Sequence, residues 1–206
     1  MYGCYMRYIW SIGLFVAILL WNVLYIFQDS WFFARQFTQL GSYERQETVM
    51  DEAQELMRYW WGEREFIDRT VYTDAEEEHL RDVKDILRWV FLIFLCVIFM
   101  WLLVSVFLWK ELLSFVMLRS LLATLTWFIF LALLLSVLAW VSWGWLFDSF
   151  HRLFFVDNWS FSAESFLIQS YPWEFFRNAM IAVLVRTLVC ILLSVAVLFG
   201  VYRLRR

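Results

Sequence analysis

The chain has 206 residues, of which 63% are hydrophobic and 22% aromatic, and its formal net charge at pH 7 is −3. A soluble domain is rarely more than about half apolar, so this composition indicates an integral membrane protein and excludes an ordinary water-soluble enzyme. The small net charge and the lack of a basic stripe argue against a nucleic-acid-binding protein.

Apolar segments long enough to cross a bilayer, which takes roughly 20 residues, cover residues 8–27, 89–109, 121–147 and 180–202. The first is predicted to be an uncleaved helix, because no small-residue cleavage site follows it. The sequence therefore predicts an all-α membrane protein with four transmembrane helices, forming a single integral membrane domain.

The first polar segment, residues 28–88, carries eight basic and fifteen acidic residues. Thr48 is predicted to begin a helix there, with Asp51 at the capping-box position, and Gly62 is predicted to end it. The apolar face of this helix, expected to lie on the other polar segment or on lipid, consists of Leu56, Tyr59 and Trp60.

A second helix of this segment is predicted to begin at Thr73, with Glu76 completing its capping box. Residues 65–72, just before it, look extended. No helix-breaking residue occurs between this start and Trp89, so the helix is expected to continue directly into the second span.

The basic residues near the spans predict the orientation in the membrane. Basic residues dominate the amino end, the short 110–120 loop and the carboxyl-terminal tail, whereas residues 28–88 and 148–177 are acidic overall. This pattern places both termini in the cytoplasm and the two long segments on the extracellular side of the plasma membrane.

The two histidines of the chain, His79 and His151, are each expected a few residues beyond the outer end of a span. A lone histidine at this position is usually structural, but two on one side, each with an acid nearby, indicate acid–base chemistry near pH 7. Asp82 shares a helix face with His79, and Asp148 and Asp157 lie near His151. Such a carboxylate would fix the imidazole tautomer. Which histidine is the base stays open.

Large apolar residues crowd the segment 150–176, which is too hydrophobic for an exposed loop. It is expected to lie in the membrane interface or to wall a cavity that lipid can enter. Candidate substrate contacts in it are Phe154, Phe155 and Trp159, and Arg152 is a candidate contact for lipid headgroups. Arg186, inside the fourth span, is a further candidate because a charge there is costly. Snorkelling or a structural hydrogen bond is the alternative.

Neither a nucleophile nor a metal site is evident. The cysteines, at positions 4, 96 and 190, fall in or beside apolar runs, and no nucleophile-elbow motif occurs. For an acyl-transfer enzyme, this favours direct transfer between two groups of one substrate over a covalent acyl-enzyme. No spacing typical of a metal site surrounds the histidines.

Two blocks of residues resemble the lipoprotein intramolecular transacylases, the Lit family of Gram-positive bacteria. One is Glu78-His79-Leu80-Arg81-Asp82-Val83-Lys84. The other is Phe150-His151-Arg152-Leu153-Phe154-Phe155, followed by Asp157, Trp159, Leu167-Ile168, Pro172 and Phe175-Phe176. With four spans around these blocks, the resemblance extends over nearly the whole chain.

The resemblance implies a membrane acyltransferase that acts on a diacylated lipoprotein among membrane lipids. It would move the sn-2 acyl chain of the diacylglyceryl group to the α-amino group of the amino-terminal cysteine, giving a lyso-form lipoprotein. His79 and His151 would be the catalytic residues, and no metal or nucleotide cofactor is needed because an ester becomes an amide.

Two other interpretations of the residues stay open. The chain could be a non-enzymatic membrane assembly or chaperone subunit that binds partners through its acidic external segment. It could instead be a metal-dependent membrane hydrolase.

Overall fold

The computed structural model describes all residues except 1, 66–69, 111, 113, 156–158 and 205–206. Over the described residues every regular element is a helix, which confirms the all-α prediction. The chain divides into two compact units. The span unit comprises residues 1–23, 91–137 and 182–206, and the histidine unit comprises residues 24–90 and 138–181.

Within the described residues, the helices long and apolar enough to cross a membrane number four, as predicted. They are α1 (Tyr2–Ile26), α5 (Asp74–Phe107), α6 (Phe115–Val141) and α9 (Trp173–Leu204). The third was predicted at residues 121–147 but ends earlier, because the backbone of Ser142 leaves the helical conformation with φ −148° and ψ 50°. A separate helix, α7 (Trp143–Phe154), follows.

Helix α5 is 34 residues long, which corresponds to about 51 Å. The hydrocarbon core of a bilayer is only about 30 Å thick. Because the charged residues of α5 all lie before Trp89, residues 74–88 must extend beyond the hydrocarbon region. The prediction that one helix continues from Thr73 into the second span is confirmed.

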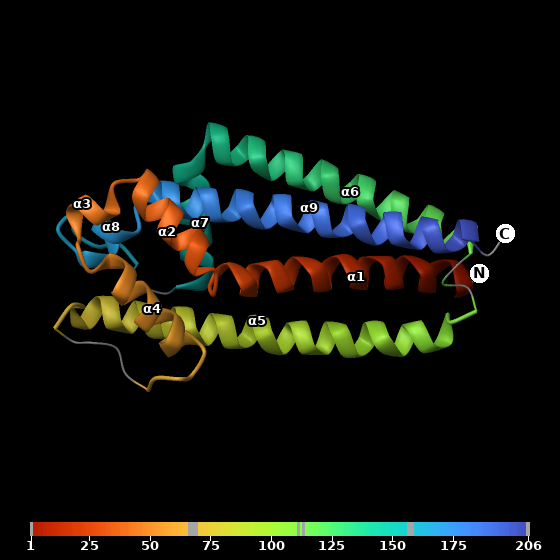
Figure 1. The fold of residues 1–206 in the computed structure, drawn as a ribbon, viewed down its shortest axis with the longest axis horizontal. Coiled ribbons are helices and arrows are strands. Elements are labelled where there is room, and N and C mark those ends of the chain that lie inside the picture. Colours follow the sequence, from red (N-terminus) through yellow and green to blue (C-terminus); the bar gives the residue numbers. More distant parts are fainter. Residues whose placement is uncertain (1, 66–69, 111, 113, 156–158, 205–206) are drawn as a thin grey trace. The chain divides into compact units, whose positions relative to one another are not determined.

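In the span unit, α1, α5, α6 and α9 lie side by side around an apolar interior that includes Trp10, Met117 and Ile191 (Figure 1). Polar side chains also join these helices. The Trp10 indole N–H donates to Ser105 Oγ (2.7 Å), and the hydroxyls of Ser11 and Ser120 are 3.1 Å apart. Figure 1 places the amino end of α1 and the carboxyl end of α9 at the same end of this unit, as an even number of spans requires.

The histidine unit contains α2 (Ser30–Gln39), α3 (Ser42–Arg45), α4 (Val49–Trp60), the start of α5, α7 and α8 (Phe166–Ser170). Its core is aromatic. The ring centroids of Phe33, Phe37, Tyr171 and Phe175 lie 5.0–6.2 Å from one another. Such ring pairs add specific geometry to a large burial of apolar area, so this cluster holds α2 and the start of α9 together.

The predicted ends of α4 are largely confirmed. The helix begins after Thr48, but the Thr48 side chain makes no capping hydrogen bond, so the predicted capping box with Asp51 does not form. Gly62 ends the helix with φ +81°, and the Glu63 N–H donates to Arg58 O (2.9 Å). This is the Schellman arrangement that glycine favours. Residues 66–69 of the extended segment predicted at 65–72 lie outside the described residues. Residues 65 and 70–72 form turns and bends, so the described part of this segment is not a strand.

Candidate active site

His79 lies in the second turn of α5, whose start is fixed by the predicted capping box. The backbone N–H and hydroxyl of Thr73 both donate to Glu76 Oε2 at 2.9 Å, and the Glu76 N–H donates to Thr73 Oγ1 at 3.3 Å. These reciprocal hydrogen bonds give partners to backbone N–H groups at the start of the helix that would otherwise be unpaired. These hydrogen bonds therefore fix where α5 starts, and with it the position of His79.

Glu76 also joins α5 to α8. Its side chain is buried, and its second oxygen, Oε1, accepts a hydrogen bond from the Leu167 N–H (3.0 Å) in the first turn of α8. The other end of α8 is held by α3. Ser42 Oγ donates to Ser170 O, and Arg45 Nε donates to Gln169 O, both at 2.9 Å. Both ends of α8 are thus fixed.

We expect Glu76→Gln to lower the free energy of unfolding by about 1–3 kcal/mol. Both carboxylate oxygens accept hydrogen bonds, so an amide nitrogen in place of either oxygen would face an N–H donor. Thermal unfolding of the purified protein in detergent measures this loss. Asp74→Asn is the matched control, because it removes a charge from the same turn at an exposed position. Equal losses in both variants would mean that charge at the helix start, and not the contact with α8, is responsible.

His151 is buried on the last turn of α7, and its orientation is set by the backbone. Its Nδ1 lies 2.8 Å from the carbonyl oxygen of Phe147. Because a carbonyl can only accept, Nδ1 carries the proton and Nε2 of the neutral ring holds a lone pair. The sequence suggested a carboxylate for this role. In the structure, a backbone carbonyl accepts the hydrogen bond from Nδ1 instead, and it fixes the tautomer equally well.

The three carboxylates predicted to support the histidines differ in burial and in their relation to the imidazoles. Asp148 is half-buried, and its charge acts on His151. Asp82 is exposed, and among the described residues it makes no hydrogen bond to His79. Asp157 lies outside the described residues. Of the predicted carboxylates that the structure describes, Asp148 is the one whose charge raises the pKa of a histidine.

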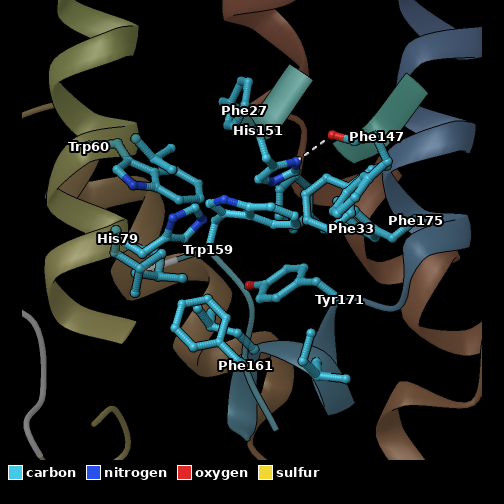
Figure 2. Close-up of a pocket in the computed structure, with 16 residues that line it drawn as sticks. Phe27, Phe33, Trp60, His79, Phe147, His151, Trp159, Phe161, Tyr171 and Phe175 are labelled. Carbon is cyan, nitrogen blue, oxygen red and sulfur yellow. Dashed lines mark hydrogen bonds between the residues drawn. The ribbon is translucent and has the colours of Figure 1, made fainter. Parts of the chain in front are cut away.

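The two imidazoles lie close together in the histidine unit. Their ring centroids are 6.1 Å apart, with an interplanar angle of 20° (Figure 2). Phe155 packs against both rings, with its centroid 4.6 Å from His79 and 5.4 Å from His151. Trp159 lies 5.2 Å from His151, and Phe161 lies 5.5 Å from His79. Aromatic rings therefore confine both histidines.

Burial lowers the pKa of both imidazoles. For His79, loss of hydration and then repulsion from His151 lower the pKa to about 4. For His151, loss of hydration lowers the pKa, against the opposing effects of the Phe147 hydrogen bond and the Asp148 charge. Both rings are therefore neutral at pH 7, which is the form that can accept a proton.

A pocket opens between the two histidines, with a cavity volume of about 100 Å³. Its other walls are mostly aromatic: Phe27, Phe33, Leu56, Trp60, Leu80, Val83, Phe147, Trp159, Phe161, Leu167, Ile168, Tyr171, Phe175 and Phe176. A liquid water takes up roughly 30 Å³, and sites for drug-sized ligands have about 300–1,000 Å³. The space thus fits a small chemical group but not a long chain.

The predicted substrate contacts separate into two groups. Trp159 lines the pocket, and Phe155 contacts both histidines. Phe154 is 49% exposed and packs on Phe150, and Arg152 is also exposed. Arg186 lies on α9 in the span unit. Of the four that belong to the histidine unit, the structure brings two to the histidines.

Several residues of the pocket were not predicted from the sequence, among them Phe33, Trp60 and Tyr171. A signal for α2 was present, since Asp29 accepts a hydrogen bond from the Phe32 N–H (3.0 Å) as a helix cap. The buried positions 32, 33, 36 and 37 of α2 also follow helical spacing. Trp60 had been identified on the apolar face of its helix, without a link to the histidines.

Among the described residues, no group of three or more His, Cys, Asp or Glu side chains is arranged to hold a metal ion. The helices and the paired neutral imidazoles define a multi-pass membrane protein with two histidines side by side in an aromatic pocket. The chain belongs to the lipoprotein intramolecular transacylase Lit family, whose model matches residues 8–176. It is thus an acyltransferase by family, as the resemblance implied.

The fold is similar to solved structures of the membrane integral lipoprotein intramolecular transacylase Lit from Bacillus cereus. One has a TM-score of 0.79 at 18% identity, covering 96% of this chain and 93% of that chain. Two more carry a histidine-to-arginine or a histidine-to-alanine mutation. Each has a TM-score of 0.73 at 18% identity and covers 96% of this chain, with 89% and 90% of its own chain covered. No curated protein matches in sequence.

Proposed function

We propose that this protein moves the sn-2 acyl chain of a diacylglyceryl lipoprotein to the α-amino group of its amino-terminal cysteine. The product is a lyso-form lipoprotein with an amide-linked acyl chain. The observation that carries the proposal is the pair of neutral imidazoles, 6.1 Å apart, beside a small aromatic pocket.

His151 is the proposed general base. An α-amine has a pKa near 8, and as it attacks the ester it must lose a proton. The Nδ1–H···O=C bond to Phe147 leaves Nε2 of His151 free to accept that proton, and it raises the basicity of the ring. In our assignment, the fixed tautomer distinguishes His151 from His79.

His79 is the proposed partner of the leaving group. When the tetrahedral intermediate collapses, the bond between the acyl carbon and the glycerol oxygen breaks, and this oxygen must gain a proton. The proton that His151 accepted returns to this oxygen while neutral His79 hydrogen-bonds to it. One ester and one amine thus become one amide and one alcohol, with no net change in protons.

The pocket is proposed to hold the ester and the amine while the acyl chains extend into lipid. Excluding water from this space suppresses hydrolysis of the ester, and close confinement of two groups of one molecule raises their effective concentration. We further propose that the site opens on the extracellular face, as the distribution of basic residues predicts.

Mass spectrometry of lipoproteins from a bacterial host that expresses this chain tests the proposal. The host must otherwise leave its lipoproteins diacylated with a free α-amine. Because the transfer is intramolecular, the mass of the lipopeptide stays the same, so fragmentation must locate the acyl chain on nitrogen. The amine must also become resistant to labelling. A free amine with both chains still on glycerol contradicts the proposal, and a gain in mass indicates another acyl donor.

A further inference from the structure

The hydroxyl of Tyr171 is a buried polar group inside the aromatic pocket. The Tyr171 side chain is 8% exposed, and its ring packs between Phe33, Phe37 and Phe175. Figure 2 shows its oxygen at the end of the ring that points into the pocket. Within the described part of the chain, this oxygen has no hydrogen-bond partner.

A buried hydroxyl without a partner is unfavourable, and natural proteins rarely keep one without a reason. Removing it would cost nothing in packing, since phenylalanine has the same ring. Trp60, which lines the same pocket, likewise has a buried indole N–H without a partner among the described residues. Because an indole N–H can only donate, the pocket suits a ligand group that accepts hydrogen bonds.

Tyr171 remains a donor throughout the accessible pH range. Burial, with the nearby charge of Glu52, raises the pKa of its phenol well above the ordinary value of 10. The hydroxyl therefore keeps its proton and does not act as a base. Its role must be to donate a hydrogen bond to an acceptor on the ligand.

We propose that Tyr171 is a further catalytic residue, whose hydroxyl donates a hydrogen bond to the carbonyl oxygen of the migrating acyl group. This inference rests on the proposed acyl transfer. When the amine nitrogen bonds to the acyl carbon, the π electrons of the carbonyl move onto its oxygen, which becomes negative. When the bond to the glycerol oxygen breaks, these electrons re-form the carbonyl, and Tyr171 keeps its proton throughout.

The pocket geometry supports this role over simple substrate binding. A donor that surrounding rings already hold in place does not have to reorient when negative charge develops on the oxygen. In a site without water, it interacts strongly with that charge. The ester carbonyl of the substrate is a weaker acceptor than the oxyanion. The hydrogen bond therefore stabilises the transition state more than it stabilises the bound ester. Its main effect is to raise kcat, with little effect on KM.

The test compares Tyr171→Phe with the wild type on a synthetic diacylglyceryl lipopeptide in detergent. We expect kcat to fall about 100-fold with little change in KM, as for removal of one oxyanion donor. The unfolding temperature should be equal to that of the wild type or higher, because an unpartnered buried hydroxyl is removed. Loss of activity together with preserved stability is the signature that a merely structural tyrosine would not give.

Tyr43→Phe is the matched control. Tyr43 packs on Phe37 in the same aromatic cluster, but it does not line the pocket, so deleting its hydroxyl should leave kcat unchanged. A Tyr171→Phe variant with wild-type kcat overturns the inference, as does one whose loss of activity follows a lower unfolding temperature. A wild-type protein that forms no amide overturns the proposed function and this inference together.

Discussion

His151→Asn is expected to lower the turnover number by roughly 10²–10⁴-fold, the range of general-base catalysis. The asparagine amide nitrogen can occupy the place of Nδ1 and still donate to the Phe147 carbonyl, but it offers no base at the place of Nε2. The variant should therefore fold normally and lose only the proton acceptor. Turnover of a synthetic diacylglyceryl lipopeptide, measured beside the unfolding temperature in detergent, separates the two properties.

His79→Gln tests the other half of the assignment. The glutamine amide reaches the place of Nε2 and keeps one hydrogen-bonding group near the leaving oxygen, so we expect a smaller loss of turnover than for His151→Asn. A larger loss for His79→Gln would reverse the two roles. If both variants retain wild-type turnover, the histidines are structural, as a non-enzymatic assembly subunit would require.

The elements that the sequence predicted well depend on local rules or on long apolar runs. Thr73 and Glu76, which form the capping box, are three positions apart, and the helix end at Gly62 needs only a glycine in a left-handed conformation. The four membrane-spanning helices follow from the lengths of their apolar segments. Such signals do not depend on the rest of the fold.

The site depends on contacts that no local pattern contains. Glu76 and Leu167, which fix α8, are 91 positions apart, and the acceptor is reached by a backbone N–H that has no sequence signature. The carbonyl that orients His151 is also a backbone atom. Nearby acidic residues were visible in the sequence, so Asp148 and Asp157 were the natural candidates.

Asp82 shows why sharing a helix face with His79 is not enough to predict a contact between the two side chains. Residues three apart on a helix differ by about 60° in direction, so one can face a pocket while the other faces solvent. His79 points to the aromatic rings, whereas Asp82 is exposed. The helices packed against α5 decide which of its residues are buried and which are exposed. The positions of those helices were unknown from the sequence.

Phe154 and Phe155 were both predicted to contact substrate, and the structure distinguishes them. Phe155 is buried and packs against both imidazoles, whereas Phe154 is 49% exposed and packs on Phe150. We expect Phe155→Ala to destabilise the protein by about 3–5 kcal/mol, through lost burial and the cavity left behind. The imidazoles would also lose the ring that packs against both of them, and turnover should fall about 100-fold.

Phe154→Ala is the neighbouring control, and Phe155→Leu separates volume from ring geometry. An exposed side chain contributes little to stability, so Phe154→Ala should keep its unfolding temperature and most of its turnover. Leucine refills most of the space left by Phe155, so Phe155→Leu should recover stability more than turnover if the ring orients the histidines. If leucine restores both equally, Phe155 serves only as packing. If Phe154→Ala instead loses more turnover than Phe155→Ala, the exposed ring must contact the acyl chains, and the substrate enters along that face of α7.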